Sequence, residues 1–205
     1  MNLTGTLVII ILTSLVSLEG IRNENWRSVF LFNPNGISEG KRIFGVFTHM
    51  FFHADYQHLI FNMLSLYMLG SFLESKWQND FHSKGIVLYV TLYLVGGIAS
   101  TIIPFFRHKH NWNYRSLGAS GAVSAVVFAA IMWEPTMPLG LMFIPIPIPA
   151  FVFGPLYLLF EFYAMKRGNT GIANDGHISG ALFGILFALF LDPSRATDFI
   201  RIFIK

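Results

Sequence analysis

Two side chains that could together cleave an acyl bond each begin a separate apolar stretch of the chain. Ser120 lies within the sequence Gly118-Ala119-Ser120-Gly121, and His177 follows much later, ahead of a second apolar stretch. A serine hydroxyl becomes a useful nucleophile when a neighbouring base accepts its proton, and histidine often serves as that base. Ionisable groups are costly in lipid and are usually functional there. The pair therefore predicts hydrolysis by a nucleophile at membrane depth.

The composition indicates a membrane protein. Only 12% of the 205 residues are charged and 54% are apolar, against about 25% and 45–50% in soluble domains. Six stretches are nearly free of charge and cover residues 3–18, 58–73, 85–106, 117–133, 150–165 and 177–191. Several are shorter than the roughly twenty residues that usually cross a bilayer. Such a stretch can still span if the bilayer is thin, if the helix is not tilted, or if the helix extends beyond the apolar residues. We expect an all-α fold, a polytopic six-helix bundle forming one domain over residues 1–205.

Composition also limits the partners of this protein. The chain contains no cysteine, which excludes disulfides and thiolate metal sites but leaves the compartment open. Its pI of 9.3 comes from dispersed Lys and Arg residues, which suit anionic lipid headgroups better than a nucleic-acid groove. The first stretch lacks the basic start and clear cleavage site of a signal peptide, so we assign it to the bundle.

The direction of the helices places the chemically competent side chains together. The second, fourth and sixth stretches must run the same way through the membrane, so their N-terminal ends share one face. They open with His58, Ser120 and His177. Free N–H groups at a helix N-terminus favour an oxyanion near Ser120. Asn62 lies one turn after His58 on the same helix face, where its amide could assist.

Small residues supply the contact between the fourth and sixth helices. Gly180 and Gly184 follow His177 on its own face, and Gly118 and Gly121 flank Ser120. Small residues at helical spacing let two membrane helices approach closely. We therefore expect these glycines to bring the serine within reach of the histidine.

The ordered set of motifs resembles the rhomboid family of intramembrane serine proteases. It comprises Gly118-Ala119-Ser120-Gly121, His58-x-x-x-Asn62, His177-x-x-Gly180-x-x-x-Gly184 and a first-loop segment, Phe47 to His53. The match covers about residues 44–192. The resemblance implies that Ser120 is the nucleophile and His177 the general base and later acid. It also implies an oxyanion hole formed by His58, Asn62 and the Ser120 backbone N–H.

The sequence departs from the family pattern at two places. Phe44-Gly45 stands where relatives often have Trp-Arg, and Ser124 stands one turn after the serine, where relatives often have an aromatic. We expect water or another aromatic, such as Phe128 or Tyr114, to fill the space beside Ser124. Asp175 precedes the histidine too closely to orient it, so we expect a dyad. Glu161 receives no role.

Metal catalysis is the less favoured alternative for this cluster of histidines. His49, His53 and His58 fall within ten residues, but no carboxylate at ligand spacing completes a metalloprotease motif. We expect no metal and no other cofactor. Between the fourth and fifth helices, prolines alternate over residues 144–149, which predicts an extended polyproline segment and a helix starting no earlier than Pro149.

The resemblance implies hydrolysis of peptide bonds in or near the transmembrane segments of other membrane proteins, within the lipid bilayer. The alternative is a catalytically silent rhomboid-like protein that binds membrane helices, although such a protein needs neither Ser120 nor His177. A small transporter is a further alternative, but its polar groups should lie at the midplane. The resemblance implies a cytoplasmic N-terminus. This orientation places more Lys and Arg residues in the outer loops than in the inner ones, contrary to the positive-inside rule. We expect a multi-pass protein of a bacterial inner membrane.

Overall fold

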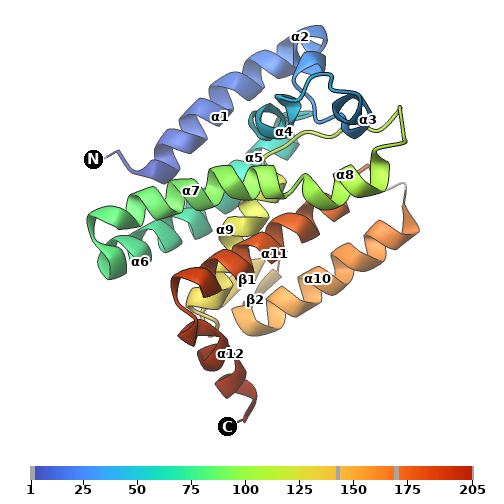
Figure 1. Ribbon diagram of the computed structural model, residues 1–205. Helices are drawn as coiled ribbons and strands as arrows, with labels where there is room; N and C mark the ends of the chain where they lie inside the picture. Colours follow the sequence, from blue (N-terminus) through green and yellow to red (C-terminus); the bar gives the residue numbers. More distant parts are fainter. Residues whose placement is uncertain (1–2, 142–143, 169–170, 205) are drawn as a thin grey trace.

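The protein is a bundle of long helices with short helices in its connecting segments (Figure 1). The structure is a computed structural model that describes residues 3–141, 144–168 and 171–204. The N-terminal half contains α1 (Gly5–Arg22), α2 (Glu24–Val29), α3 (Pro34–Ser38), α4 (Gly45–Thr48), the 3-10 turn η1 (His49–Phe51), α5 (Tyr56–Ser65), the π-helical turn η2 (Leu66–Gly70), α6 (Ser71–Phe81) and α7 (Ser83–Ala99). The C-terminal half contains α8 (Ile102–His108), α9 (Ser120–Trp133), the strands β1 (Pro138–Leu141) and β2 (Ile144–Pro149), α10 (Ala150–Arg167), α11 (Asn174–Leu191) and α12 (Ser194–Ile204).

Each of the six predicted apolar stretches contains a long helix. Within residues 3–141, 144–168 and 171–204, three helical segments are both long and apolar enough to cross a membrane, namely Gly5–Arg22, Ser83–His108 (α7 with α8) and Asn174–Leu191. Helix α9 is apolar but shorter, and α5, η2 and α6 follow one another without a break. The prediction of an all-α, polytopic membrane bundle is confirmed, with one small β-hairpin added.

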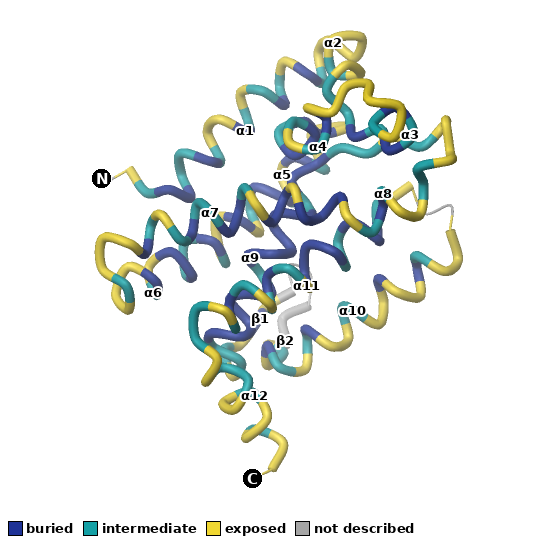
Figure 2. Tube along the Cα trace, in the orientation of Figure 1, coloured by how far each residue is buried: buried dark blue, intermediate teal, exposed yellow. Residues whose placement is uncertain are grey.

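Helix α9 forms the centre of the bundle, and α7 and α11 pack against it (Figures 1 and 2). All of its residues except Ser120 and Val127 are buried. A helix that is apolar on every face must be covered on every face. The N-terminus of α9 is therefore held by protein on several sides, and so is the serine that begins it.

The backbones of α9 and α11 meet at two glycines. A Cβ atom at Gly180 would overlap the carbonyl of Gly121, and one at Gly184 would overlap the carbonyl of Ala125. The sequence prediction of small-residue packing between these helices is confirmed. Any larger side chain at either glycine would force the two helices apart.

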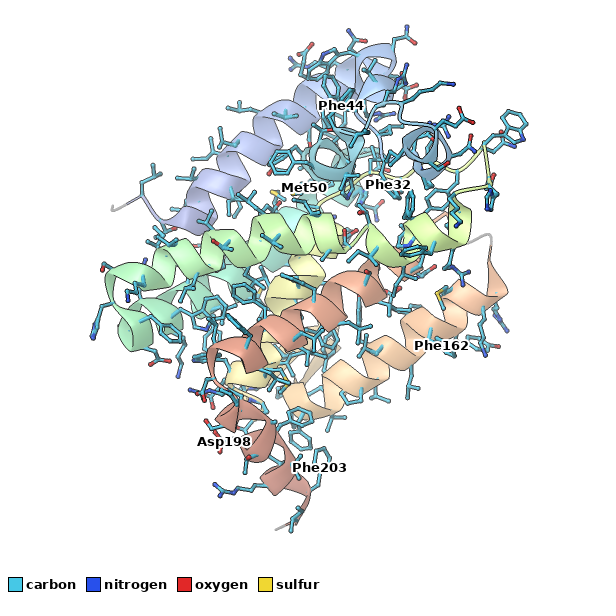
Figure 3. The ribbon with its side chains drawn as sticks, viewed as in Figure 1. Phe32, Phe44, Met50, Phe162, Asp198 and Phe203 are labelled. Atoms are coloured by element: carbon cyan, nitrogen blue, oxygen red, sulfur yellow. The ribbon has the colours of Figure 1, made fainter. Side chains whose placement is uncertain are left out.

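Helix α10 lies at the edge of the bundle beside α11 (Figure 1). Its buried residues form one narrow stripe, made of Ala150, Gly154, Glu161 and Ala164. The rest of its surface is mostly apolar and open, as Figure 3 shows for Phe162, which is 46% exposed. Because one face alone is packed, α10 has less holding it in place than α9 or α11.

The connection between α9 and α10 differs from the sequence prediction. Strand β2 pairs antiparallel with β1, with Pro138 opposite Pro149, instead of forming a free polyproline segment. Proline can occupy an edge strand where its missing N–H faces away from the ladder. The predicted start of the fifth helix is confirmed, since α10 begins directly after Pro149.

Helix α12 was not expected from the sequence, because the match to the family pattern ends near residue 192. Its apolar and polar residues separate onto two faces, and Phe203 packs edge-on against Phe151 of α10 (Figure 3). Charges at Arg195 and Arg201 interrupt the apolar run. An amphipathic helix of this type lies against the bundle or the lipid surface instead of crossing it.

A buried carboxylate fixes the start of α1. Glu74 on α6 is 2% exposed and accepts hydrogen bonds from the N–H groups of Gly5 (2.7 Å) and Thr6 (2.8 Å). The Thr6 hydroxyl donates to the same carboxylate at 2.6 Å. These N–H groups have no acceptor within their own helix, and a carboxylate complements the helix dipole. Glu74 therefore joins α1 to α6.

We predict that Glu74→Gln lowers the stability of the protein without unfolding it. The amide offers one acceptor oxygen in place of two, so at least one buried donor of α1 loses its partner, at a cost of about 1–3 kcal/mol. Thermal unfolding in detergent measures the change. Glu39→Gln is the control, because the Glu39 side chain is 50% exposed and pairs with Lys41 on the surface. Equal melting temperatures for the two variants would contradict the capping role.

Candidate active site

The turn before Ser120 requires glycine. Gly118 has a φ of +123°, in the region that side-chain-bearing residues rarely adopt. A methyl group there would lie 2.6 Å from Cε1 of His58 and 3.7 Å from the Ser120 hydroxyl oxygen. The Gly118 N–H donates to the carbonyl of His49 at 3.0 Å. The turn thus presents the hydroxyl of Ser120 next to the imidazole of His58.

His53 holds the residue immediately before the serine. Its Nε2 accepts the Ala119 N–H at 3.2 Å, and its Nδ1 lies 2.7 Å from the Ser17 hydroxyl oxygen. Ser17 donates its own proton to the carbonyl of Phe51 at 2.8 Å, so it must accept from His53. This chain of bonds assigns the proton of His53 to Nδ1 and links α1 to the start of α9.

His58 and Asn62 lie on α5, next to this turn. The His58 ring packs edge-on against His53, with 4.8 Å between the ring centroids, and Asp55 caps the helix by accepting the His58 N–H at 2.7 Å. Asn62 is buried, and its amide donates to the His58 carbonyl at 2.9 Å. The amide has a second N–H available for another acceptor.

His177 shares a small polar cavity with Ser120. The cavity has room for about one water molecule, with a volume of about 20 Å³, and Ser100, Gly118 and Gly121 also line it. Among the described residues, no direct hydrogen bond joins the two side chains. Such contacts are often long in a free enzyme and shorten when substrate binds. The structure therefore brings the two sequence-predicted residues to one cavity.

The far side of the His177 ring contacts two residues that the sequence analysis did not assign to the site, and a third bonds to one of them. Nδ1 lies 3.0 Å from Oε1 of Glu161, and the Tyr157 hydroxyl lies 3.4 Å from the same nitrogen. Asn174 donates to Oε2 of Glu161 at 2.7 Å. One feature of the sequence could have indicated this contact: Glu161 is an acidic residue in an apolar helix, where a carboxylate needs a partner.

Asp175 points away from His177, as its position in the sequence predicted. Its carboxylate accepts a hydrogen bond from His108 at 2.9 Å and pairs with Arg107 at 3.3 Å. The His108 ring stacks on Tyr114 with 3.9 Å between the centroids. Asp175 therefore joins the start of α11 to the end of α8 and takes no part in orienting His177.

The space beside Ser124 is filled by a different aromatic residue from those expected. The Tyr157 hydroxyl hydrogen-bonds to Ser124 and approaches His177 from α10. Phe128 packs against the Tyr157 ring, with 5.8 Å between centroids, whereas Tyr114 stacks on His108. The sequence could not indicate Tyr157, because the rotation of α10 about its axis decides which of its residues face the site.

Two of the three neighbouring histidines, His49 and His53, have hydrogen-bond partners within the protein. His49 Nδ1 lies 3.0 Å from the Gly45 carbonyl, and both ring nitrogens of His53 are hydrogen-bonded. In the part of the chain that the structure describes, no group of three or more potential metal-ligating side chains converges. His49 and His53 thus have structural roles around the Ser120 turn.

The fold and the site define a helical membrane protein with a serine and a histidine at one small cavity. A family model described as a rhomboid domain matches residues 40–194. The chain therefore belongs to the rhomboid family, and the resemblance found in its sequence is confirmed.

Individual relatives are distant. The chain is 26% identical over 167 residues to RHOMBOID-like protein 12, mitochondrial, of Arabidopsis thaliana, covering 74% of this chain and 47% of that protein. It is 27% identical over 141 residues to Presenilin-associated rhomboid-like protein A, mitochondrial, of Danio rerio, covering 67% and 34%. It is 23% identical over 158 residues to Rhomboid protease AarA of Providencia stuartii, covering 68% and 53%. The chain spans between about a third and about a half of the length of these relatives.

These comparisons support an integral membrane protein. Two of the three relatives carry mitochondrial names. The expectation of a bacterial inner membrane is therefore not supported.

We predict that the hydrogen bond from the Ala119 N–H to His53 makes the stability of the folded protein depend on pH. His53 lies in the segment before α5, outside the membrane-spanning helices, and burial lowers its pKa from 6.5 to about 3, with a contribution from His58. Between these values the unfolded chain binds the proton and the native protein does not, so stability is complete above pH 6.5 and falls as pH drops. Melting temperatures at pH 8 and pH 5 should differ more in wild type than in His53→Gln, which cannot titrate. Equal differences would contradict the assignment.

Proposed function

We propose that this protein is an intramembrane serine endopeptidase that acts through a Ser120–His177 dyad. The observation that carries the proposal is that the two side chains, from the N-terminal parts of α9 and α11, line one small cavity. The close contact of these helices at Gly180 and Gly184 supports it, because that contact fixes the spacing of the pair. Membership of the rhomboid family, with a protease among its relatives, is consistent with this activity.

In the proposed reaction, the Ser120 oxygen attacks the scissile carbonyl carbon while its proton passes to Nε2 of His177. The tetrahedral intermediate collapses when the C–N bond breaks, and His177 returns the proton to the leaving amine. A water then attacks the acyl-enzyme ester with His177 again as base, and Ser120 recovers its proton. No cofactor enters these steps.

The oxyanion of the intermediate needs donors near Ser120. The proposed donors are the Ser120 N–H, which belongs to the unsatisfied first turn of α9, and the side chains of His58 and Asn62. The position of the His58 ring against Gly118 supports this role. By contrast, the Ala119 N–H already donates to His53 and is not available.

The proposed substrates are transmembrane segments of other membrane proteins. Helix α10 has an open, apolar outer surface, which suits contact with lipid and with an apolar substrate helix. The bundle is proposed to cross the bilayer six times, through α1, α5–α6, α7, α9, α10 and α11. A catalytically silent, helix-binding protein is the alternative that the following test separates.

Ser120→Ala should abolish proteolysis and leave the fold intact. Losing one hydroxyl changes packing little, whereas removing the nucleophile of a serine protease costs on the order of 10⁴-fold or more in turnover. Purified protein incubated with a library of transmembrane peptides, followed by mass mapping of products, measures the activity. Wild type should also react with a serine-directed fluorophosphonate, and Ser120→Ala should not. Wild-type protein that neither cleaves nor labels would favour the binding alternative.

His58→Ala and Asn62→Ala should each lower turnover more than substrate affinity. Removing one oxyanion donor costs about 10²–10³-fold in a soluble serine protease, and a partly wet site should show less. Kinetics on a cleavable transmembrane peptide separate kcat from KM. Ser124→Ala is the control, because its hydroxyl bonds to Tyr157 and is not a proposed donor. Unchanged kcat in both test variants would refute the assignment of these two donors.

A further inference from the structure

Glu161 is a buried acid in the part of α10 that faces the site. It is 4% exposed and belongs to the narrow stripe by which α10 packs on the bundle. A carboxylate placed among apolar helices is costly unless hydrogen bonds or an opposite charge compensate it. Glu161 therefore requires an explanation, and neither its neighbours in sequence nor the family pattern provides one.

The compensation comes from hydrogen bonds to both oxygens, and the Tyr157 hydroxyl bonds to the same carboxylate. Asn174 donates to Oε2 at 2.7 Å, and His177 Nδ1 lies 3.0 Å from Oε1. The His177 side chain is 13% exposed and that of Glu161 is 5% exposed, so solvent screens this pair weakly. Within the described residues, His177 is the single side chain near Glu161 that can become a cation. The basic residues at the end of α10 lie instead over aromatic rings, Lys166 over Phe162 and Arg167 over Tyr163.

We propose that Glu161 is the third member of the catalytic group, a positioning residue that orients His177 and stabilises its charged form. This inference rests on the proposed Ser120–His177 dyad and adds a residue to it. A carboxylate oxygen accepts, so the Nδ1 of His177 must carry the proton. The other ring nitrogen, Nε2, is then unprotonated and can accept the proton of Ser120.

The charge on Glu161 matters at the moment of attack. When the Ser120 proton moves to Nε2, the imidazole becomes a cation with Nδ1–H still bonded to Oε1. The carboxylate does not take that proton; it stabilises the cation through a charge-assisted hydrogen bond in a site with little water. When the proton leaves for the amine, the ring returns to its neutral form in the same orientation.

The remaining candidates for this role are already engaged. Asp175, which is closer in sequence, bonds to His108 and Arg107. Tyr157 is 3.4 Å from Nδ1, a longer contact than that of Glu161, and its hydroxyl also bonds to Ser124. Tyr157 therefore packs beside the ring, and the carboxylate of Glu161 is the group that meets Nδ1–H most closely.

The test is the rate at which a small fluorophosphonate labels Ser120 in Glu161→Gln. Glutamine keeps the size of the side chain and removes its charge. The phosphonate reaches the serine without needing a transmembrane helix to pass α10, so the readout reports activation of the nucleophile and not substrate entry. We expect the maximal labelling rate to fall about 10- to 100-fold, less than in a soluble triad that is disrupted at this position. The concentration for half-maximal rate should stay within about twofold, because the contact acts on proton transfer and not on reagent binding.

The matched control is Glu74→Gln, the same change at another buried glutamate that contacts α1 and not the site. It should lower the melting temperature and leave the labelling rate of folded protein unchanged. If Glu161→Gln does not fold, Glu161→Met removes the charge without leaving a buried amide and gives the same comparison. A folded Glu161 variant that labels at the wild-type rate would overturn the proposal. Failure of wild type itself to label would instead overturn the proposed protease function.

Discussion

The direct contact between the backbones of α9 and α11 is the constraint on which the site depends. Gly180 meets the Gly121 carbonyl and Gly184 meets the Ala125 carbonyl, so the interaxial distance is set by main-chain atoms instead of flexible side chains. Ser120 and His177 lie at the N-terminal side of this contact. In a bilayer, where lipid competes equally well for apolar side chains, close van der Waals packing of this kind supplies much of the association energy. The same feature therefore stabilises the bundle and spaces its reactive groups.

A second layer of polar contacts fixes the turn that carries the serine. His49 and His53 come from the segment before α5, yet they accept the N–H groups of Gly118 and Ala119, far away in sequence. The acceptor is the backbone carbonyl in His49 and the ring Nε2 in His53. Through Ser17 the same chain of bonds reaches α1. Because the N–H of Ala119 is used in this way, the first-turn donors beyond it are the ones left for a substrate oxygen.

Much of this arrangement could be predicted from the sequence, and the reasons for the failures are physical. Apolar stretches, glycine spacing and helix direction predict that Ser120, His177 and His58 share a face; in the structure Ser120 and His177 line one cavity, and His58 lies beside Gly118. Pairing between β1 and β2 was missed, because alternate prolines look the same in a free polyproline segment and in an edge strand. The contact of Glu161 with His177 was missed for a different reason. Spacing along a helix shows which residues share a face, but not which face meets a neighbouring helix when the outer surface is equally apolar.

The position of Glu161 links the packing of α10 to the contact with His177. This helix is held along one stripe, and the same stripe carries the carboxylate that meets His177. Any displacement of α10 away from α11 would therefore separate the acid from the base at the same time as it widened the bundle. In the proposed mechanism, a widened bundle would have an exposed Ser120 but an unsupported His177, and full reactivity would return only on closure. That mechanism would protect passing segments from hydrolysis for as long as the bundle is open.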